Sequence, residues 1–508
     1  MKEHYDVAIM GAGVGGLVTG AILAAKEKMN VIVLEKNRVI GGRVVSFGKQ
    51  HGSDYSGSEV RELLAKCAFT TVIKSEPDFD QIIAKGVLKD FIIDCGWHGT
   101  GGGQRSRLGL IGRALGKPIP FSDGLGTAFL EDERWLQLTE LTKEWPAESI
   151  TERSRVAYER QLLSAEQASK YDQVDLASYL ESVTDDKLVR DYYCDLARWE
   201  LGINSCSRIS AGEWIKVNNG VAAAGRHLVH GGGIGEVTGG YKTIADILAS
   251  VIQENGGEVR TEHPVTEVII KNWKAEGVVV KGKTGNEEIK ASNVVCNPPP
   301  YHLPGIIPDK YFVGELMQRV KNMYSTGAVC GHLCLKEPLE KDYWPKGQFV
   351  VRRNPEGRDL LLDTGGVPAV GFEQTSIVDP SRAPEGRYLV QFCDIVDPEA
   401  LQPGHPTLQQ QADVMIRFFR NHYPHFDDIL EWYFITDSPL GSGLAPVIGI
   451  CGDRRFPIRH PLIPNLFFTG DCVEQWDTFT SGAAHGGVLC ASAVADRDYL
   501  SLLPPYWR

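Results

Sequence analysis

The stretch "YDVAIMGAGVGGLVTGAILAAKEKMNVIVLE" near the N-terminus constrains the fold more than any other part of the chain. The apolar run at 7–10 predicts a buried parallel strand, and the run at 31–34 predicts a second one. Between them lie a G-x-G-x-x-G turn at 11–16 and a helix expected over 15–28. This order of strand, turn, helix and strand predicts a doubly wound, Rossmann-like α/β domain.

The glycines stand where a pyrophosphate would approach the main chain. Gly11 permits the tight turn, Gly13 leaves room for the phosphates, and Gly16 lets the helix pack on the strand. Val14 and Gly15 begin the helix, whose first amides would face the phosphates. We therefore predict a dinucleotide-binding site at this turn.

The residues after the second strand indicate which dinucleotide binds. Glu35, followed by Lys36, ends that strand about 20 residues beyond the glycines, where a carboxylate accepts the ribose hydroxyls. Gly41, Gly42 and Arg43 come next, and they complete an E-x-x-x-x-x-G-G-R segment. This segment resembles the FAD-dependent amine oxidase and phytoene desaturase superfamily. The resemblance implies FAD, held non-covalently, with the second glycine pair and the arginine along its phosphate and ribityl chain.

Other segments resemble the same superfamily in chain order. Residues 91–102, "FIIDCGWHGTGG", resemble its Asp-x-Gly strand beside the flavin ring, and residues 230–269 resemble its Gly-rich entry to a helix. In "NLFFTGDCVEQWDTFTSGAAHGGVLCA" the Gly-Asp pair is implied to hold the ribityl-phosphate end, and the helix start to point its amides at the flavin ring. The cofactor residues added by this resemblance are Val265, whose backbone would pair with adenine, Gly470, Asp471, Gly482, Gly487 and Val488.

The resemblance also predicts how the chain is divided. Residues 376–390, "SIVDPSRAPEGRYLV", are similar to the phytoene desaturase-like (carotenoid desaturase) branch, and their Pro and Gly predict a turn into a strand without chemistry. The expected FAD-binding domain comprises residues 1–120, 231–300 and 440–508, and an interleaved α+β substrate-binding domain comprises residues 121–230 and 301–439.

Bulk composition narrows the classes of partner. The chain has 53 Lys and Arg against 65 Asp and Glu, a net charge of −12 that argues against a nucleic-acid partner. Its 11 cysteines show no disulfide pattern or metal spacing, which predicts a reducing compartment and no metal site. No apolar run approaches the roughly 20 residues of a membrane span. We expect a cytoplasmic protein with at most a peripheral membrane contact.

Four side chains are candidates for the chemistry. Phe479 falls where the amine oxidase branch usually has a Tyr over the flavin face, and Trp476 precedes it; the alternative for both rings is core packing. His485, in the helix-opening turn, suits proton transfer near neutral pH. The alternative for His485 is a cap or a hydrogen bond that holds a neighbour, and His98 has the same two explanations.

These features favour an FAD-dependent oxidoreductase that dehydrogenates a small apolar, alicyclic or terpenoid carbon skeleton by hydride transfer to flavin N5. One alternative is a redox-neutral flavoenzyme, a hydratase or isomerase, and another is an amine oxidase. A non-enzymatic protein resembling GDP dissociation inhibitors is a third, although Gly41-Gly42-Arg43 and Gly470-Asp471 count against it. No motif indicates the electron acceptor or an oligomeric state.

Overall fold

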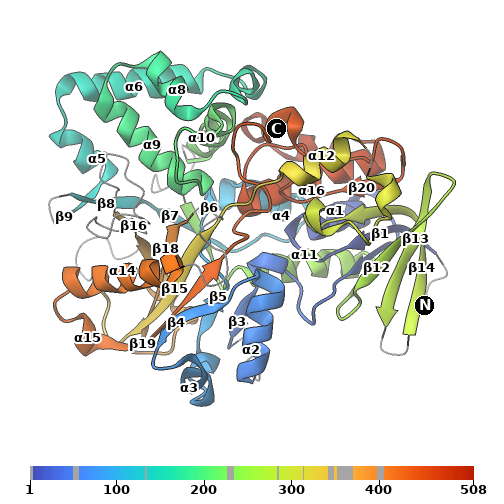
Figure 1. Cartoon of the computed structure of the whole chain (residues 1–508), viewed down its shortest axis with the longest axis horizontal. Helices are drawn as coiled ribbons and strands as arrows, with labels where there is room; N and C mark the ends of the chain where they lie inside the picture. The colour runs from blue at the N-terminus through green and yellow to red at the C-terminus, as the bar shows by residue number, and fades with distance from the viewer. Residues whose placement is uncertain are drawn as a thin grey trace.

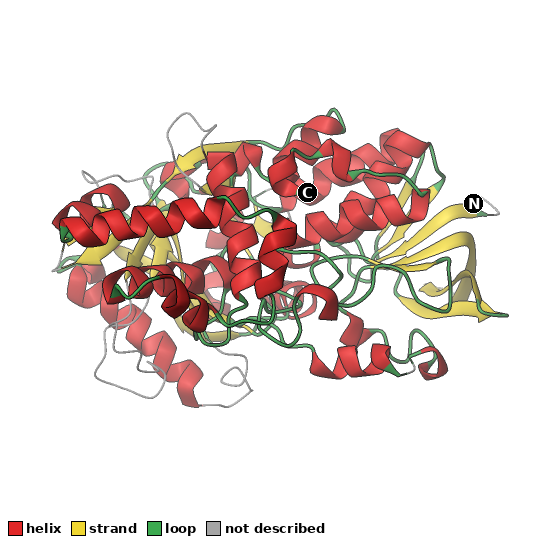
Figure 2. Ribbon diagram, turned by 90° about the horizontal axis from the view of Figure 1, so that it is seen from above, coloured by secondary structure: helices red, strands yellow, loops and turns green. Residues whose placement is uncertain are grey.

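Two sheets, placed side by side and surrounded by helices, organise the chain (Figure 1). The structure is a computed structural model. It describes residues 4–49, 56–131, 134–225, 234–282, 285–312, 314–340, 348–351, 370–396 and 406–508. In Figure 2 the strands near the N-terminus lie at one end of the molecule, and helices cover much of the rest.

One sheet carries the N-terminal turn. Its strand order is β11-β2-β1-β14-β13-β12, and β20 pairs with the C-terminal end of β14. The strands are β1 (Tyr5–Met10), β2 (Val31–Leu34), β11 (Glu258–Arg260), β12 (Val265–Lys271), β13 (Lys274–Gly282), β14 (Gly285–Cys296) and β20 (Leu466–Phe468). Pairs among β11, β2, β1, β14 and β20 are parallel, whereas β12, β13 and β14 pair antiparallel.

Three helices cover one face of this sheet. The helices α1 (Val14–Glu27), α11 (Lys242–Glu254) and α16 (Phe479–Ala495) share one apolar cluster with Val7, Ile9, Val31 and Val33. The alternate residues of β1 and β2, among them Ala8 and Ile32, belong to a second cluster on the opposite face. Because both faces are covered, these strands are continuous apolar runs rather than alternating ones.

The second sheet forms the wall of the predicted substrate side. Its order is β4-β19-β15-β18-β17-β16-β8-β9. The strands are β4 (Val72–Glu76), β19 (Leu430–Ser438), β15 (Ala328–Leu335), β18 (Tyr388–Ile395), β17 (Gly371–Glu373), β16 (Gln348–Val351), β8 (Thr127–Glu131) and β9 (Arg134–Gln137). Helix α14 (Pro406–His422) packs on the face that carries Val329, Leu333 and Phe392.

Shorter elements join the two sheets. Strand β3 (Ser46–Gly48) pairs with β5 (Ile92–Asp94), and β10 (Ile234–Val237) pairs with both β6 (Thr100–Gly101) and β7 (Phe121–Leu125). The other helices are α2 (Gly57–Leu63), α3 (Phe79–Ala84), α4 (Arg107–Ala114), α5 (Leu138–Leu141), α6 (Ala147–Gln161), α7 (Ala165–Ala168), α8 (Leu176–Val183), α9 (Lys187–Leu201), α10 (Ala211–Gly225), α12 (Glu315–Asn322), α13 (Thr375–Val378) and α15 (Phe426–Ile429). Helices α5 to α10 gather above the second sheet in Figure 1.

The predicted fold class is confirmed, because a mostly parallel sheet and a mixed second layer are both present. The domain boundaries stay a prediction, and two strand pairs cross them. Strand β4, in a segment expected to bind FAD, pairs with β19, and β7, in the expected substrate-binding domain, pairs with β10 of the expected FAD-binding domain.

The cysteines differ from the sequence analysis, which found no disulfide pattern among them. Cys194 and Cys206 form a disulfide with their Cα atoms 5.5 Å apart, because the chain turns back after α9 and returns one cysteine to the other. Their 12-residue separation matches no motif.

Two further observations concern the described residues alone. No group of three or more His, Cys, Asp or Glu side chains there is placed to hold a metal ion. None of the described helices has the length and the apolar character needed to cross a membrane.

Candidate functional site

The N-terminal turn is a cradle that only small residues can line. A Cβ atom on Gly13 would lie 2.7 Å from the Nδ2 atom of Asn297, and one on Gly15 would lie 2.6 Å from the Cα atom of Gly470. At Gly16 a Cβ would collide with a main-chain oxygen of the turn. The glycines therefore bring the start of α1 against the C-terminal Gly-Asp pair, as a site shared by both motifs requires.

Two polar residues after β14 complete this cradle, and the sequence interpretation missed both. The Oδ1 atom of Asn297 accepts a hydrogen bond from the Gly16 amide at 3.0 Å, and the main-chain amide of Asn297 donates to the Met10 carbonyl at 3.0 Å. The Tyr301 hydroxyl is buried and has no hydrogen-bond partner among the described residues. Both lie within "CNPPPY", residues 296–301. The signal that could have revealed them is a polar turn at the carboxyl end of a predicted parallel strand, where ligands bind in folds of this class.

Glu35 sits where an acid for the ribose is expected. Its two carboxylate oxygens accept hydrogen bonds from the Ala12 and Asn37 amides, each at 2.9 Å. Burial raises the pKa of Glu35, although these hydrogen bonds act in the opposite direction. A cavity of about 320 Å³ opens beside this turn, with Lys36, Asn37, Arg38, Glu62 and Lys66 in its lining. Val265, predicted at the adenine, is buried at the start of β12.

Arg43 joins the N-terminal and C-terminal motifs directly. Its Nη2 atom lies 3.0 Å from both carboxylate oxygens of Asp471. Asp471 also accepts hydrogen bonds from the Gly443 amide at 2.7 Å and the Ser442 hydroxyl at 3.2 Å. Burial alone would raise the pKa of Asp471, but Arg43 and these donors outweigh it and hold that pKa below its ordinary value. Asp471 is therefore a carboxylate fixed beside Arg43.

The start of α16 is a strained turn. Asp477 and Phe479 have φ angles of 106° and 53°, in the left-handed region that non-glycine residues rarely adopt. A Cβ atom on Gly482 would lie 2.9 Å from the Asp477 carbonyl oxygen, and one on Gly487 would lie 2.7 Å from the Cβ atom of Val18. Val488 is fully buried behind them. Strained backbone of this kind clusters at functional sites and must be held by its surroundings.

Two buried arginines supply part of that support. Arg455 and Glu213 are completely buried and form an ion pair at 3.0 Å. Arg455 also donates to the Asp471 carbonyl at 2.9 Å, and Glu213 accepts the Asp477 amide at 3.1 Å. The second arginine, Arg107, pairs with the Asp477 carboxylate. Neither arginine was predicted, because their ion-pair partners lie 242 and 370 residues away along the chain.

The packing around Arg107 explains Trp476 and His485. The guanidinium lies between the rings of Trp476 and Trp507, 4.0 and 4.4 Å from their centroids. The His485 ring meets the edge of Trp476, and its Nδ1 atom lies 3.1 Å from the Trp476 carbonyl oxygen. Burial and then Arg107 hold the pKa of His485 well below its ordinary value. The geometry thus favours core packing for Trp476 and a hydrogen-bonding role for a neutral His485.

The other two candidates lie apart from that packing. The tip of the Phe479 ring is 2.8 Å from where a Cβ of Gly202 would stand, so the ring faces the turn after α9. His98 stacks on Tyr241 with 4.5 Å between ring centroids. Its Nε2 atom is buried without a partner among the described residues, and burial lowers its pKa although Asp94 acts the other way. His98 lies in the loop predicted to face the flavin. A bound flavin would supply the hydrogen-bond partner that its Nε2 atom lacks among the described residues.

Comparisons with known proteins agree with the motifs. A model of the family described as flavin containing amine oxidoreductase matches residues 14–495. An inactive all-trans-retinol 13,14-reductase of Danio rerio is 24% identical over 572 residues, covering 98% of this chain and 87% of that protein. A 4,4'-diapophytoene desaturase (4,4'-diapolycopene-forming) of a Methylomonas species is 34% identical over 99 residues, 18% of this chain and 19% of that protein. The crystal structure of an oxidoreductase from Methanosarcina mazei has a TM-score of 0.68 at 16% identity, covering 95% of this chain and 98% of that one.

Proposed function

Because the chain belongs to the flavin-containing amine oxidoreductase family, we propose that it binds FAD non-covalently and dehydrogenates an apolar or alicyclic carbon skeleton of the isoprenoid class. The observation that carries the substrate class is Phe479, an apolar ring at the start of α16 where an amine oxidase usually has a tyrosine. The desaturase and the reductase, the latter described as inactive, are named for diapophytoene and all-trans-retinol, and these names support the same substrate class.

The residues on the N-terminal side would hold the nucleotide. Glu35 would accept the ribose hydroxyls, and the first amides of α1 would face the pyrophosphate. Arg43 and the orphaned Tyr301 hydroxyl would serve the phosphate and ribityl chain. The glycine contacts at 13, 15 and 16 fit this ligand, since any side chain there would fill the space.

The residues on the C-terminal side would hold the ring and exclude water. Bound FAD supplies the hydride acceptor. The amides at the start of α16 would direct the positive end of the helix dipole toward the flavin ring and would stabilise the negative charge of its reduced form. His485 is a neutral hydrogen-bond donor that fixes Trp476, so we assign it a positioning role rather than proton transfer. His98 and His332 each have a buried ring nitrogen without a hydrogen-bond partner among the described residues, and His98 is the one in the loop predicted to face the flavin.

Anaerobic mixing of the FAD-loaded protein with three substrate classes tests the proposal. The panel consists of saturated or partly saturated isoprenoids, alicyclic acids and primary amines. We expect the visible flavin band to bleach with an isoprenoid or alicyclic compound and to stay unchanged with the amines. Phe479→Tyr is the matched variant, because it restores the polar ring without changing the backbone.

Each other outcome points to one alternative. Bleaching by amines alone would make the protein an amine oxidase. Turnover of a substrate without any bleaching, measured by product analysis, would indicate a hydratase or isomerase. A protein that stays colourless after incubation with FAD would favour a binding protein related to GDP dissociation inhibitors.

A further inference from the structure

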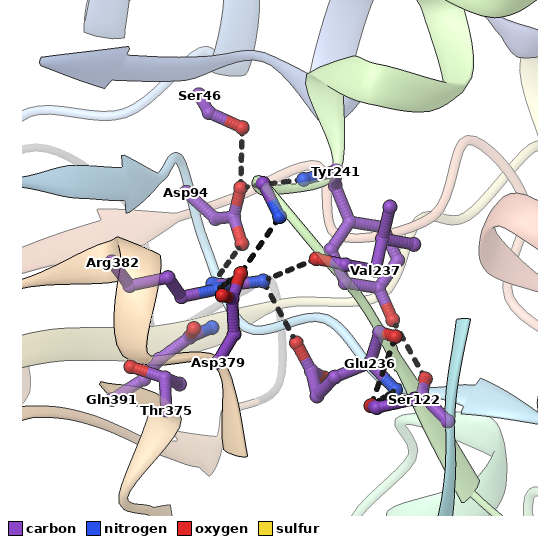
Figure 3. A network of polar contacts seen from close by, with 12 residues as sticks. Ser46, Asp94, Ser122, Glu236, Val237, Tyr241, Thr375, Asp379, Arg382 and Gln391 are labelled. Atoms are coloured by element: carbon purple, nitrogen blue, oxygen red, sulfur yellow. Dashed lines mark hydrogen bonds and ion pairs between the residues drawn. The ribbon is translucent and has the colours of Figure 1, made fainter. Parts of the chain in front are cut away.

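A buried charge cluster lies behind loop 94–98, the loop predicted to face the flavin (Figure 3). Its only arginine, Arg382, is 1% exposed. The Nη1 atom of Arg382 donates to Asp94 at 2.6 Å, and Nη2 donates to Glu236 at 3.0 Å and to the Val237 carbonyl at 3.1 Å. Asp379, three residues before the arginine, lies 3.7 Å from its Nε atom.

The cluster ties the second sheet to the predicted flavin side. Arg382 ends a short helical turn (Pro380–Arg382) before β18, whereas Asp94 ends β5 and is the first residue of the loop. A second tie comes from β18 itself, since the Gln391 side chain donates to the Gly96 carbonyl at 2.5 Å. The segment 380–395 therefore holds the loop at both its first residue and its third.

Asp94 is the point at which these ties meet. One of its oxygens binds Arg382, and the other accepts the Ser46 hydroxyl at 2.5 Å and the Tyr241 amide at 2.9 Å. Tyr241 precedes α11 and carries the ring on which His98 stacks. A displacement of Asp94 would consequently move both the loop and the surface under His98.

The charges of the cluster favour a bound proton. Three carboxyl groups, those of Asp94, Glu236 and Asp379, lie within 3.7 Å of one guanidinium, and each residue is at most 5% exposed. Three carboxylates against one guanidinium would leave a net charge of two minus among these four described residues, and unpaired buried charges are costly. The neighbouring imidazoles His98 and His332 do not offset it, because burial lowers the pKa of both.

Hydrogen bonding indicates which of these three acids is best suited to hold that proton. Asp94 has donors on both oxygens, and Asp379 accepts the Gly239 amide at 2.7 Å and the Ser381 amide at 3.0 Å. By contrast, the Oε1 atom of Glu236 has no partner among the described residues. Burial, followed by Glu373, raises the pKa of Glu236 well above its ordinary value. Of the three acids that contact Arg382, Glu236 is therefore the one best suited to hold a proton.

We propose that Arg382 is the positioning residue of loop 94–98, that it acts through the Asp94 carboxylate, and that Glu236 belongs to the cluster as a protonated acid. The first part rests on the proposed function, because it assigns the loop to the flavin. The part that concerns Glu236 does not, and it can be tested without any flavin.

The flavin arm of the test compares Arg382→Met with Arg382→Lys and Glu236→Gln, each reconstituted with FAD. Arg382→Met should raise the dissociation constant for FAD about tenfold, as loss of a charged hydrogen bond near the ligand implies, and should change the visible circular dichroism of the flavin. Arg382→Lys should restore part of both, and Glu236→Gln at neutral pH should match the natural protein. If Arg382→Met does not fold, the FAD affinity and the flavin circular dichroism of Arg382→Lys are compared with those of Glu236→Gln, and a change in Arg382→Lys alone supports the positioning role.

The proton arm measures urea unfolding of the natural chain and Glu236→Gln between pH 5 and 8. A carboxyl whose pKa is raised in the folded state takes up a proton on folding, so its contribution to stability falls as the pH rises above its ordinary value of 4.5. A glutamine at this position takes up no proton on folding. In Glu236→Gln the free energy of unfolding should therefore fall less steeply with rising pH, by the slope that corresponds to one proton. The charged groups facing Glu236 in both proteins are Asp94, Tyr241, Glu373, Asp379 and Arg382.

The outcomes separate the two claims. A folded Arg382→Met protein with unchanged FAD affinity and flavin dichroism would overturn the positioning role. An unchanged pH slope in Glu236→Gln would overturn the protonated acid. If the natural protein binds no FAD at all, the proposed function fails together with the positioning role, while the slope still decides the state of Glu236.

Discussion

The two ends of the predicted FAD site are built by different means. At the nucleotide end, residues 11–43 supply the turn, the acid and the arginine from one continuous stretch. At the ring end, the turn before α16 is held by Arg107, Arg455 and Glu213, which lie 22 to 370 residues away along the chain from their partners. The nucleotide end therefore takes most of its binding groups from one stretch, which Asn297 and Asp471 join from far along the chain. The turn at the ring end is instead held by completely buried arginines whose ion-pair partners come together only in the complete fold.

This difference predicts where the molecule is fragile. Removing one member of a buried ion pair leaves a charge without compensation and costs about 3–5 kcal/mol. Removing a local hydrogen bond costs about 1–3 kcal/mol at most, and an exposed ion pair contributes little. The predictions below test that order.

The largest effect is expected from Arg455→Met. It leaves the Glu213 carboxylate, which is completely buried, without its partner and should lower the free energy of unfolding by about 3–5 kcal/mol. Urea unfolding followed by circular dichroism measures this. Arg454→Met, at an exposed neighbouring position, is the matched control and should change stability by less than about 0.5 kcal/mol. Equal effects of the two variants would refute the contrast between the ends.

Glu35→Ala should act on the ligand more than on the fold. It removes the acceptor of the Ala12 and Asn37 amides and of the ribose, so FAD binding should weaken by about 1–3 kcal/mol. Titration of the apoprotein followed by flavin fluorescence measures the affinity. Glu276→Ala, on the exposed part of β13, serves as the control. Unaltered affinity in Glu35→Ala would show that the acid does not bind the ribose.

His485→Ala should cost about 1–2 kcal/mol of stability, because the Trp476 carbonyl loses its donor and the ring leaves a gap. A histidine whose pKa is lowered in the folded state makes stability fall as the pH drops below its ordinary value of 6.5. That part of the pH dependence should disappear in the variant, which unfolding at pH 5 and pH 7.5 would show. Turnover reduced at least 100-fold in FAD-replete His485→Ala would instead restore the acid–base role.

The smallest effect belongs to the nucleotide end. Arg38 and Glu59 form a 2.7 Å ion pair beside the cavity there, but their side chains are 43% and 38% exposed. Water screens such a pair, so Arg38→Ala should change the free energy of unfolding by less than about 1 kcal/mol. A loss comparable with that of Arg455→Met would contradict the expectation that this exposed pair contributes little to stability.

The same contrast explains what the sequence could reveal. The turn at 11–16, Glu35 and the Gly41–Arg43 segment follow one another in a fixed spacing, so local rules place them. Arg382 stands in a segment interpreted only as a turn, and its role depends on Asp94, 288 residues away. Asn297 and Tyr301 were missed for the same reason. Trp476 and His485 were recognised as unusual, but only their packing against Arg107 shows what they do.

The most direct test of the central claim is release of the cofactor. The purified chain is loaded with FAD, freed of excess ligand and precipitated with acid. We predict that the yellow colour passes into the supernatant as FAD at about one molecule per chain, because a single site is shared by the two motifs joined through Arg43 and Asp471. Colour that stays in the pellet would contradict non-covalent binding. A chain that retains no FAD at all would contradict the account as a whole.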